Sequence, residues 1–361
     1  MDLNNLFRET LKNYSAYEPG EQLGEGWIKL NANENPYPPI PEVLEEIKSA
    51  VNDKLNLYPD PLALEVRKAI LNQLLLDKDT LTDRNTVCVG NGADEILDVI
   101  FKVFIDPGDE IIVFYPSYGM YKVLAALYNA KTNEINLKED FSLPDSAYNA
   151  KGKLMFINSP NNPNGKSYGN AAILKICSSF PGIVVVDEAY AEFSDQTCLP
   201  LLKKVKNLIV IRTFSKFFSL ASMRFGYAIA DANIVKEMNK VKLPFNTSYL
   251  TQIAALASIK HRKKIFEQNK KIIEERQRLT NVLNSYKGIS VLPSDAMFIL
   301  VKFEDKSKAL KFVWDLKDKH RILVRHFNKP GLYHYVRITI GDPETNNKLL
   351  DAFKALAIKY L

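Results

Sequence analysis

Short apolar runs alternate with helical stretches between Asn52 and Met238. Several of these runs are rich in β-branched residues and are candidate strands: Thr86–Val89, Glu110–Phe114, Leu154–Asn158, Gly182–Asp187, Leu208–Arg212 and Gly226–Ile229. Apolar residues fill nearly all of each run instead of alternating with polar ones, as expected for strands that are covered on both faces of a sheet. The stretch from Asp94 to Phe104 repeats its apolar residues every three or four positions, which is typical of an amphipathic helix. The pattern therefore predicts an α/β fold with a mostly parallel central sheet.

A different pattern begins after about Lys242. This pattern predicts, in chain order, a helical run over Tyr249–Tyr286, a strand over Ala296–Lys302, a helix near Lys306–Lys319, a strand over Tyr335–Ile340 and a final helix. Helices mixed with isolated strands indicate a second, smaller α+β domain.

The segment Asn31–Pro41 contains four prolines and cannot form regular structure, so we expect an extended connector between the two domains. A chain of 361 residues is too long for one ordinary core and suits two packed domains. The predicted division is an N-terminal arm and connector at residues 1–50, which contributes to the small domain and to a dimer, a large domain at 51–243 and a small domain at 244–361.

Composition and charge exclude several classes of protein. Hydrophobic residues make up 46% and charged residues 25% of the chain, the balance of a soluble globular protein. No apolar run reaches the roughly 20 residues of a membrane helix, and the polar start carries acids, so we expect a cytoplasmic protein without a signal peptide. The net charge of +6 comes from 48 basic residues spread among 42 acidic ones, which argues against a nucleic-acid partner. The scattered Cys88, Cys177 and Cys198 indicate neither a disulfide framework nor a zinc site, and we expect no metal.

Chemically reactive residues gather where the predicted strands end. The clusters in chain order are Gly90-Asn91-Gly92-Ala93-Asp94, Tyr115-Pro116-Ser117-Tyr118, Asn158 to Gly165, Asp187-Glu188-Ala189-Tyr190 and Thr213-Phe214-Ser215-Lys216, with Arg224 shortly after the last. Ligands of open α/β sheets bind beyond the carboxyl ends of the strands. The sequence therefore predicts a ligand site at this edge of the sheet.

The order and spacing of these clusters resemble those of the fold-type-I aminotransferases, which use pyridoxal 5'-phosphate. The matching features are Asn162-Pro163-x-Gly165, Asp187-x-x-Tyr190, Ser215-Lys216 and Arg224. The interval from Asp187 to Lys216 is 216 − 187 = 29 residues, inside the range of that family. The resemblance extends from about Asn31 to the C-terminus and implies a fold-type-I architecture.

The resemblance assigns catalytic roles to three residues. Pyridoxal phosphate is held as a Schiff base, which only a lysine amine can form, so Lys216 is expected to hold it and later to move the substrate proton. Asp187 matches the carboxylate that keeps the pyridine nitrogen protonated. Tyr190 matches the residue that hydrogen-bonds the ring hydroxyl.

The remaining cofactor contacts follow from the same resemblance. Asn162 is expected to bind the ring hydroxyl and Tyr118 to stack on the ring. The cofactor phosphate needs donors, and the expected ones are the Arg224 guanidinium, the Ser215 hydroxyl and the backbone amides of Ala93 and Asp94, with Gly92 allowing close approach. Asp94 is expected to serve as a helix-start residue through its N–H and not through its carboxylate.

Within this superfamily the chain most resembles the histidinol-phosphate aminotransferases, through strings such as Asn33-Glu34-Asn35-Pro36 and Tyr118-Gly119-Met120-Tyr121. The reaction implied is amino transfer between L-glutamate and imidazole-acetol phosphate, giving L-histidinol phosphate and 2-oxoglutarate, in histidine biosynthesis. Arg337, Arg325 and Tyr17 match substrate-binding residues. Tyr58 matches a tyrosine that reaches the cofactor phosphate of the neighbouring subunit, which implies a homodimer.

Other functions remain open. Threonine-phosphate decarboxylase and aromatic-amino-acid aminotransferase belong to the same branch, and the pose of the substrate separates these reactions, not the cofactor residues. Asn164, Ser222-Met223 and Asp342 depart from the residues that the family mostly carries and leave the substrate less certain. A non-catalytic pyridoxal-phosphate-binding regulator is a remote alternative, because only about thirty residues precede the matching region and a DNA-binding module does not fit there.

Overall fold

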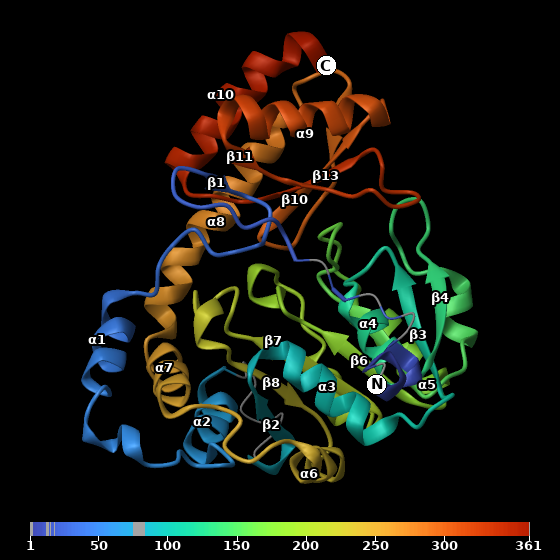
Figure 1. Cartoon of the computed structure of the whole chain (residues 1–361), viewed down its shortest axis with the longest axis vertical. Coiled ribbons are helices and arrows are strands. Elements are labelled where there is room, and N and C mark those ends of the chain that lie inside the picture. The colour runs from blue at the N-terminus through green and yellow to red at the C-terminus, as the bar shows by residue number, and fades with distance from the viewer. Residues whose placement is uncertain (1–2, 12–13, 15, 18, 75–83, 361) are drawn as a thin grey trace.

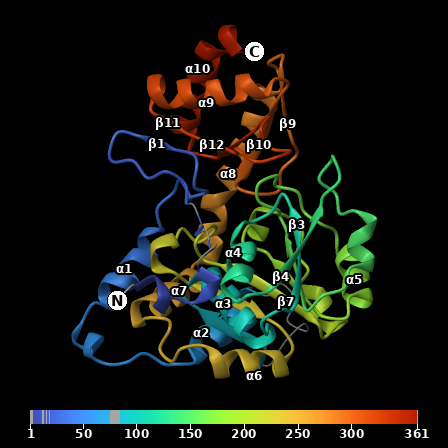
Figure 2. The same cartoon turned by 45° about the vertical axis from the view of Figure 1, so that its right-hand side comes forward.

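A large β-sheet and a smaller one organise the molecule, which is described here from a computed structural model (Figures 1 and 2). The structure describes the whole chain except residues 1–2, 12–13, 15, 18, 75–83 and 361. The strands are β1 (Ile28–Lys29), β2 (Val87–Gly90), β3 (Glu110–Tyr115), β4 (Lys131–Asn136), β5 (Leu154–Asn158), β6 (Ile183–Asp187), β7 (Leu208–Thr213), β8 (Gly226–Ile229), β9 (Ile289–Val291), β10 (Phe298–Phe303), β11 (Ile322–Leu323), β12 (Arg325–His326) and β13 (Tyr335–Thr339). The helices are α1 (Pro41–Ser49), α2 (Leu64–Ala69), α3 (Gly92–Phe104), α4 (Met120–Leu127), α5 (Asn170–Ser179), α6 (Ala232–Val241), α7 (Tyr249–Lys260), α8 (Arg262–Leu283), α9 (Lys306–His320) and α10 (Pro343–Tyr360).

The large sheet is mostly parallel, as predicted. Within the described residues its strand order is β2-β8-β7-β6-β5-β3-β4, and β4, β3, β5, β6 and β7 all run in the same direction. The strand β8 runs antiparallel to its neighbours β7 and β2. Because two reversals cancel, β2 points the same way as β7, and its carboxyl end lies at the same edge of the sheet.

Both faces of the large sheet are buried, which explains the continuous apolar runs of its strands. On β3, Ile111 and Val113 pack with α3, α4 and α6, whereas Ile112 and Phe114 pack on the other face. Side chains alternate between the two faces of a strand, so a strand covered by helices on both sides must be apolar at every position. All the predicted strands of this sheet are present, with bounds shifted by no more than a residue or so.

The edge strand β4 was not predicted. Its sequence, Lys-Thr-Asn-Glu-Ile-Asn, is polar and largely exposed, and it pairs on one side only, with β3. An edge strand needs no apolar run because part of its surface faces water. A pattern of apolar runs therefore does not reveal this strand.

The smaller sheet has the strand order β12-β13-β10-β9 among the described residues and is antiparallel throughout. Helices α8, α9 and α10 lie around it (Figures 1 and 2). The predicted helical run over Tyr249–Tyr286 is two helices, since α7 ends at Lys260 and α8 begins at Arg262. Both views show α8 running from the larger part of the molecule to the smaller one.

The N-terminal segment joins the two parts. Strand β1 pairs in parallel with β11 of the smaller part, and the chain from Leu30 to Ile40 then continues without helix or strand to α1. This course agrees with the expected extended connector. The domain limits 1–50, 51–243 and 244–361 stay a prediction. No helix in the described ranges is long and apolar enough to cross a membrane.

Candidate active site

The reactive clusters meet at the carboxyl edge of the large sheet. Strands β3, β5, β6 and β7 are parallel, so the segments that follow Tyr115, Asn158, Asp187 and Thr213 all leave the sheet at this edge. Arg224 precedes β8 and reaches the same edge because β8 runs in the opposite direction. Helix α3 begins at Gly92, two residues after the end of β2.

Lys216 follows β7 and directs its amine toward the N-terminal connector. Its Nζ donates to the backbone carbonyl of Asn33 at 3.0 Å and lies 5.9 Å from the centroid of the Tyr190 ring. The side-chain amide of Asn35 donates to the backbone carbonyl of Lys216 at 3.0 Å. Burial, and secondarily the positive charge of Arg337, lowers the pKa of Lys216 to about 8. A large fraction of this amine is therefore neutral, and nucleophilic, just above neutral pH.

Asp187 ends β6 as a buried carboxylate. Its Oδ2 accepts a hydrogen bond from the Tyr121 hydroxyl at 2.7 Å, and its Oδ1 accepts one from the Ala189 N–H at 3.1 Å. Burial raises the pKa of Asp187 to about 6, although both hydrogen bonds oppose the rise. No lysine or arginine of the described chain forms an ion pair with it. A buried carboxylate that has no cation beside it favours a cationic partner such as a protonated ring nitrogen.

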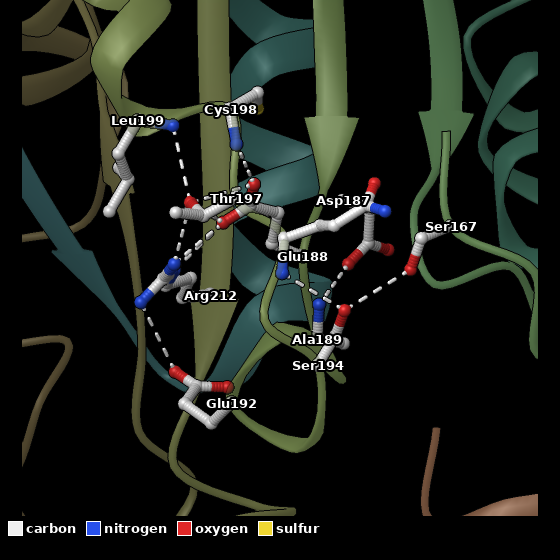
Figure 3. A network of polar contacts seen from close by, with 11 residues as sticks. Ser167, Asp187, Glu188, Ala189, Glu192, Ser194, Thr197, Cys198, Leu199 and Arg212 are labelled. Atoms are coloured by element: carbon white, nitrogen blue, oxygen red, sulfur yellow. Dashed lines mark hydrogen bonds and ion pairs between the residues drawn. The ribbon is translucent and has the colours of Figure 1, made fainter. Parts of the chain in front are cut away.

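A buried ion pair holds the end of β6 in place behind Asp187 (Figure 3). The Nη2 and Nε atoms of Arg212, on β7, donate to Oε2 of Glu188 at 2.7 and 3.0 Å. Thr197 donates its hydroxyl to the same carboxylate, and Cys198 donates its N–H to it at 2.6 Å. Glu188 and Arg212 are 2% and 7% exposed, and Nη1 of Arg212 also lies 3.5 Å from Oε1 of Glu192, so removing Arg212 would leave two carboxylates without their cation. This network fixes the turn that carries Asp187 and Tyr190.

Arg337 lies beside Asn162 and Tyr190, although 175 residues separate it from Asn162 along the chain. Arg337, on β13, donates from Nη1 to Oδ1 of Asn162 and from Nη2 to the carbonyl of Asn31, both at 2.6 Å. Its Nε is buried without a hydrogen-bond partner in the described part of the chain. The Tyr190 hydroxyl accepts a hydrogen bond from the side-chain amide of Asn33 at 3.0 Å. Burial raises the pKa of Tyr190 to about 12, so its phenol keeps its proton at neutral pH.

The residues expected to hold a phosphate also lie together. Nη1 of Arg224 lies 3.4 Å from Oγ of Ser215, and Nη2 lies 3.3 Å from Oδ2 of Asp94. Gly92 has a φ of 82°, and a Cβ atom there would lie 2.5 Å from Arg224 Nη2, so a glycine suits both the backbone and the approach of the guanidinium. The guanidinium, the Ser215 hydroxyl and the start of α3 thus form a cradle for an anion.

The carboxylate of Asp94 takes part in more than the helix start. It accepts hydrogen bonds from Arg224 and from the Tyr118 hydroxyl, the latter at 3.1 Å. The sequence predicts a role for its N–H alone. An anion that enters the cradle would compete with the Asp94 carboxylate for the Arg224 guanidinium. The N–H groups of the first turn of α3 remain suited to bind this anion.

Besides Arg337, three residues are expected to bind substrate or a second subunit, and they differ in their positions. The rings of Tyr17 and Tyr118 meet edge to face, with their centroids 5.7 Å apart. Arg325, on β12, is paired in register with Arg337 and lines a cavity of about 130 Å³ that Asn31 also lines. Tyr58 is 82% exposed and stacks on Phe245, with the ring centroids 4.5 Å apart.

Several residues of the site received no role from the sequence. Tyr121 binds Asp187, Asn33 binds Lys216 and Tyr190, Asn35 binds the backbone of Lys216, and the carbonyl of Asn31 binds Arg337. One signal was available, because Asn31, Asn33 and Asn35 recur at every second position of the expected connector.

The donor set fits pyridoxal phosphate. An amine with a lowered pKa, a buried carboxylate without a cation and an anion cradle correspond to the aldehyde, the ring nitrogen and the phosphate of that cofactor. No group of three or more possible metal ligands was found among the described residues.

Comparisons with known proteins agree with this chemistry. The family "Aminotransferase class I and II" matches residues 25–353. The histidinol-phosphate aminotransferase of Clostridium botulinum is 38% identical over 363 residues, covering 99% of this chain and 100% of that protein. That of Caldanaerobacter subterraneus subsp. tengcongensis is 36% identical over 361 residues, covering 98% and 99%. The crystal structure of histidinol-phosphate aminotransferase from Sinorhizobium meliloti in complex with pyridoxal-5'-phosphate has the same fold, with a TM-score of 0.85, 22% identity and 98% coverage of both chains. The chain therefore belongs to the class I and II aminotransferase family, and its full-length relatives place it among the histidinol-phosphate aminotransferases.

Proposed function

We propose that this chain binds pyridoxal 5'-phosphate through Lys216 and transfers an amino group from L-histidinol phosphate to 2-oxoglutarate. The products are imidazole-acetol phosphate and L-glutamate, and the reaction is a step of histidine biosynthesis. The observation that carries the proposal is the meeting of the Lys216 amine, the buried Asp187 carboxylate and the Arg224 cradle at one edge of the sheet. The names of the full-length relatives support the choice of substrate.

When bound, the cofactor supplies an electron-withdrawing ring that stabilises negative charge on the substrate carbon. Asp187 holds the proton on the ring nitrogen. Lys216 removes the proton from the substrate carbon and returns it, because its lowered pKa makes the amine both a usable base and a usable acid near neutral pH.

Two residues bind the ring oxygen of the cofactor in this proposal. Oδ1 of Asn162 already accepts from Arg337, so the NH₂ group of Asn162 is left to donate. The phenol of Tyr190 keeps its proton at neutral pH and donates as well. Tyr118 stacks on the ring, and its hydroxyl is held by Asp94. The phosphate is held by Arg224, Ser215 and the amides of the first turn of α3.

Arg337 and Arg325 bind the anionic groups of the two substrates. One site must accept a phosphate monoester in one half-reaction and carboxylates in the other, and a guanidinium fits both kinds of oxyanion. The unpartnered Nε of Arg337 and the cavity beside Arg325 leave a donor and some space for such a group. Tyr17 adds a hydroxyl from the N-terminal arm.

A spectral titration of the yellow holoenzyme tests the substrate. We expect L-histidinol phosphate to convert the bound cofactor to its amino form and 2-oxoglutarate to reverse the change. L-threonine phosphate and an aromatic amino acid are the comparison substrates. Carbon dioxide release from threonine phosphate, without the amino form accumulating, would instead identify a decarboxylase. Faster conversion by the aromatic amino acid would identify an aromatic aminotransferase.

We further propose a homodimer with shared active sites and a cytoplasmic location. Tyr58 belongs to a group of exposed apolar residues: Leu55, Leu57, Tyr58, Leu62, Leu243 and Phe245. Such a patch is suited to contact with a second subunit. Tyr58 is 82% exposed, which leaves its hydroxyl accessible to the active site of a second subunit.

Replacement of Tyr58 by phenylalanine is expected to weaken cofactor retention about tenfold, the effect of one lost charge-assisted hydrogen bond. The stacking on Phe245 survives because the ring is kept. Retention is measured as the cofactor remaining after dialysis, with sedimentation confirming that the dimer is intact. Tyr333→Phe, a second exposed tyrosine, serves as the matched control. Unchanged retention in Tyr58→Phe would contradict the shared site.

A further inference from the structure

Asn33 lies where the N-terminal connector passes between β13 and the large sheet. It is 2% exposed, and its φ of 53° lies in the left-handed region, which asparagine tolerates better than most residues. Its neighbours come from distant parts of the chain: Thr339 on β13, Tyr190 after β6 and Lys216 after β7.

The hydrogen bonds of Asn33 determine the orientation of its side-chain amide. Its backbone N–H donates to Oγ1 of Thr339 at 3.0 Å. The hydroxyl of Thr339 in turn donates to Oδ1 of Asn33, also at 3.0 Å. The oxygen of the amide is therefore directed to β13, and the NH₂ group is directed to the Tyr190 hydroxyl.

The orientation of this amide has a consequence for Tyr190. The phenol oxygen accepts from Asn33, so its own proton must point elsewhere. The described residues offer it no acceptor, and the edge-to-face contact with Phe298, at a centroid distance of 5.1 Å, holds the ring in place. The phenol is thus left as a donor directed into the site.

We propose that Asn33 is a positioning residue that, with Thr339, obliges the Tyr190 phenol to donate to the ring oxygen of the cofactor and so weakens proton binding at the cofactor's covalent link to Lys216. A donor to the ring oxygen favours its anionic form. The proton shared between that oxygen and the adjacent nitrogen is then released at a lower pH. The inference rests on the cofactor of the proposed function but not on the identity of the phosphorylated substrate.

The variants that test this role leave the backbone carbonyl that binds Lys216 unchanged. Asn33→Gly removes the amide while tolerating the positive φ. Thr339→Val removes the hydroxyl with little change of shape, and Thr339→Ser keeps the hydroxyl as the matched control. Tyr190→Phe removes the phenol itself and is the reference.

The measurement is a pH titration of the absorption of the bound cofactor in substrate-free holoenzyme. We expect Tyr190→Phe to raise the midpoint by about one pH unit, a typical effect of losing a hydrogen bond to the charged form. Asn33→Gly and Thr339→Val should raise it in the same direction, and Thr339→Ser should titrate like the wild type. When Asn33→Gly or Thr339→Val is combined with Tyr190→Phe, the midpoint should not rise further, because the phenol that Asn33 and Thr339 orient is already absent.

Three results would overturn the role of Asn33 without affecting the proposed function. The first is an unchanged titration midpoint in both Asn33→Gly and Thr339→Val, and the second is a further rise of equal size when either is added to Tyr190→Phe. The third is a raised midpoint in Thr339→Ser, since the hydroxyl is present there. A wild-type protein that binds no cofactor would overturn the proposed function together with this role. A purely structural part for Asn33 would lower stability without moving the midpoint.

Discussion

Replacement of Lys216 by alanine is expected to abolish covalent cofactor binding and to lower the transamination rate by at least about a thousandfold. The amine of Lys216 lies 5.9 Å from the centroid of the Tyr190 ring, and the proposed reaction uses it twice, as the cofactor anchor and as the base. Lys216→Arg is the matched control for charge, because a guanidinium stays protonated and cannot act as a nucleophile. Both variants should be inactive and should lack the absorption band of the cofactor linked to the lysine.

The pKa of Lys216 adds a pH dependence to this prediction. The neutral amine attacks the cofactor aldehyde, and burial lowers the pKa to about 8. The rate at which cofactor-free protein takes up the cofactor should therefore rise about tenfold per pH unit below pH 8 and level off above it. Stopped-flow absorption measures this rate. A plateau that begins near pH 10 would mean that the amine titrates as an ordinary lysine, and residual activity within tenfold of wild type in Lys216→Ala would refute the assignment.

Replacement of Asp187 by asparagine is expected to lower activity about a hundred- to thousandfold while stabilising the cofactor-free protein at neutral pH. The activity falls because asparagine cannot hold the proton on the ring nitrogen. The stability rises because a buried carboxylate without a cation disfavours the folded state. A pKa raised from 3.8 to about 6 corresponds to a penalty of about 3 kcal/mol at most.

The sign of this effect follows from proton linkage. The folded state binds the Asp187 proton more tightly than the unfolded state, so the group favours folding below about pH 4, and that contribution is lost as pH rises through about 6. The difference in free energy of unfolding between Asp187→Asn and wild type should thus be small at pH 4 and full at pH 7 and above. Urea unfolding of both cofactor-free proteins measures it. With cofactor bound the order should reverse, and a less stable Asp187→Asn at pH 7 without cofactor would contradict this account.

The adjacent carboxylates of Asp187 and Glu188 have different roles. Asp187 is held by hydrogen-bond donors without a cation, whereas the next residue, Glu188, is neutralised by Arg212 (Figure 3). The sequence Asp-Glu does not distinguish them. Their side chains point to opposite sides of the end of β6, so each meets the partners of its own side.

Some of the structure follows from local sequence alone. The strands of the large sheet are predicted because burial on both faces requires a continuous apolar run, and β4 is missed because an edge strand lacks that requirement. Asp187 ends one of these strands, Lys216 follows another, and Arg224 precedes β8. Their common edge follows from the parallel order, which short-range alternation of strands and helices also predicts.

The sequence by itself thus determined the fold class and the residues that would meet the cofactor, because those depend on patterns within a few residues and on spacings along neighbouring strands. Only the tertiary structure decided which groups control these residues. Asn33 and Thr339 are 306 positions apart, and Arg337 and Asn162 are 175 apart. A hydrogen bond forms within about 3 Å in space, whatever the separation along the chain. The partners of Lys216, Tyr190 and Asp187 therefore became identifiable only when the connector, β13 and α4 were placed against the edge of the sheet.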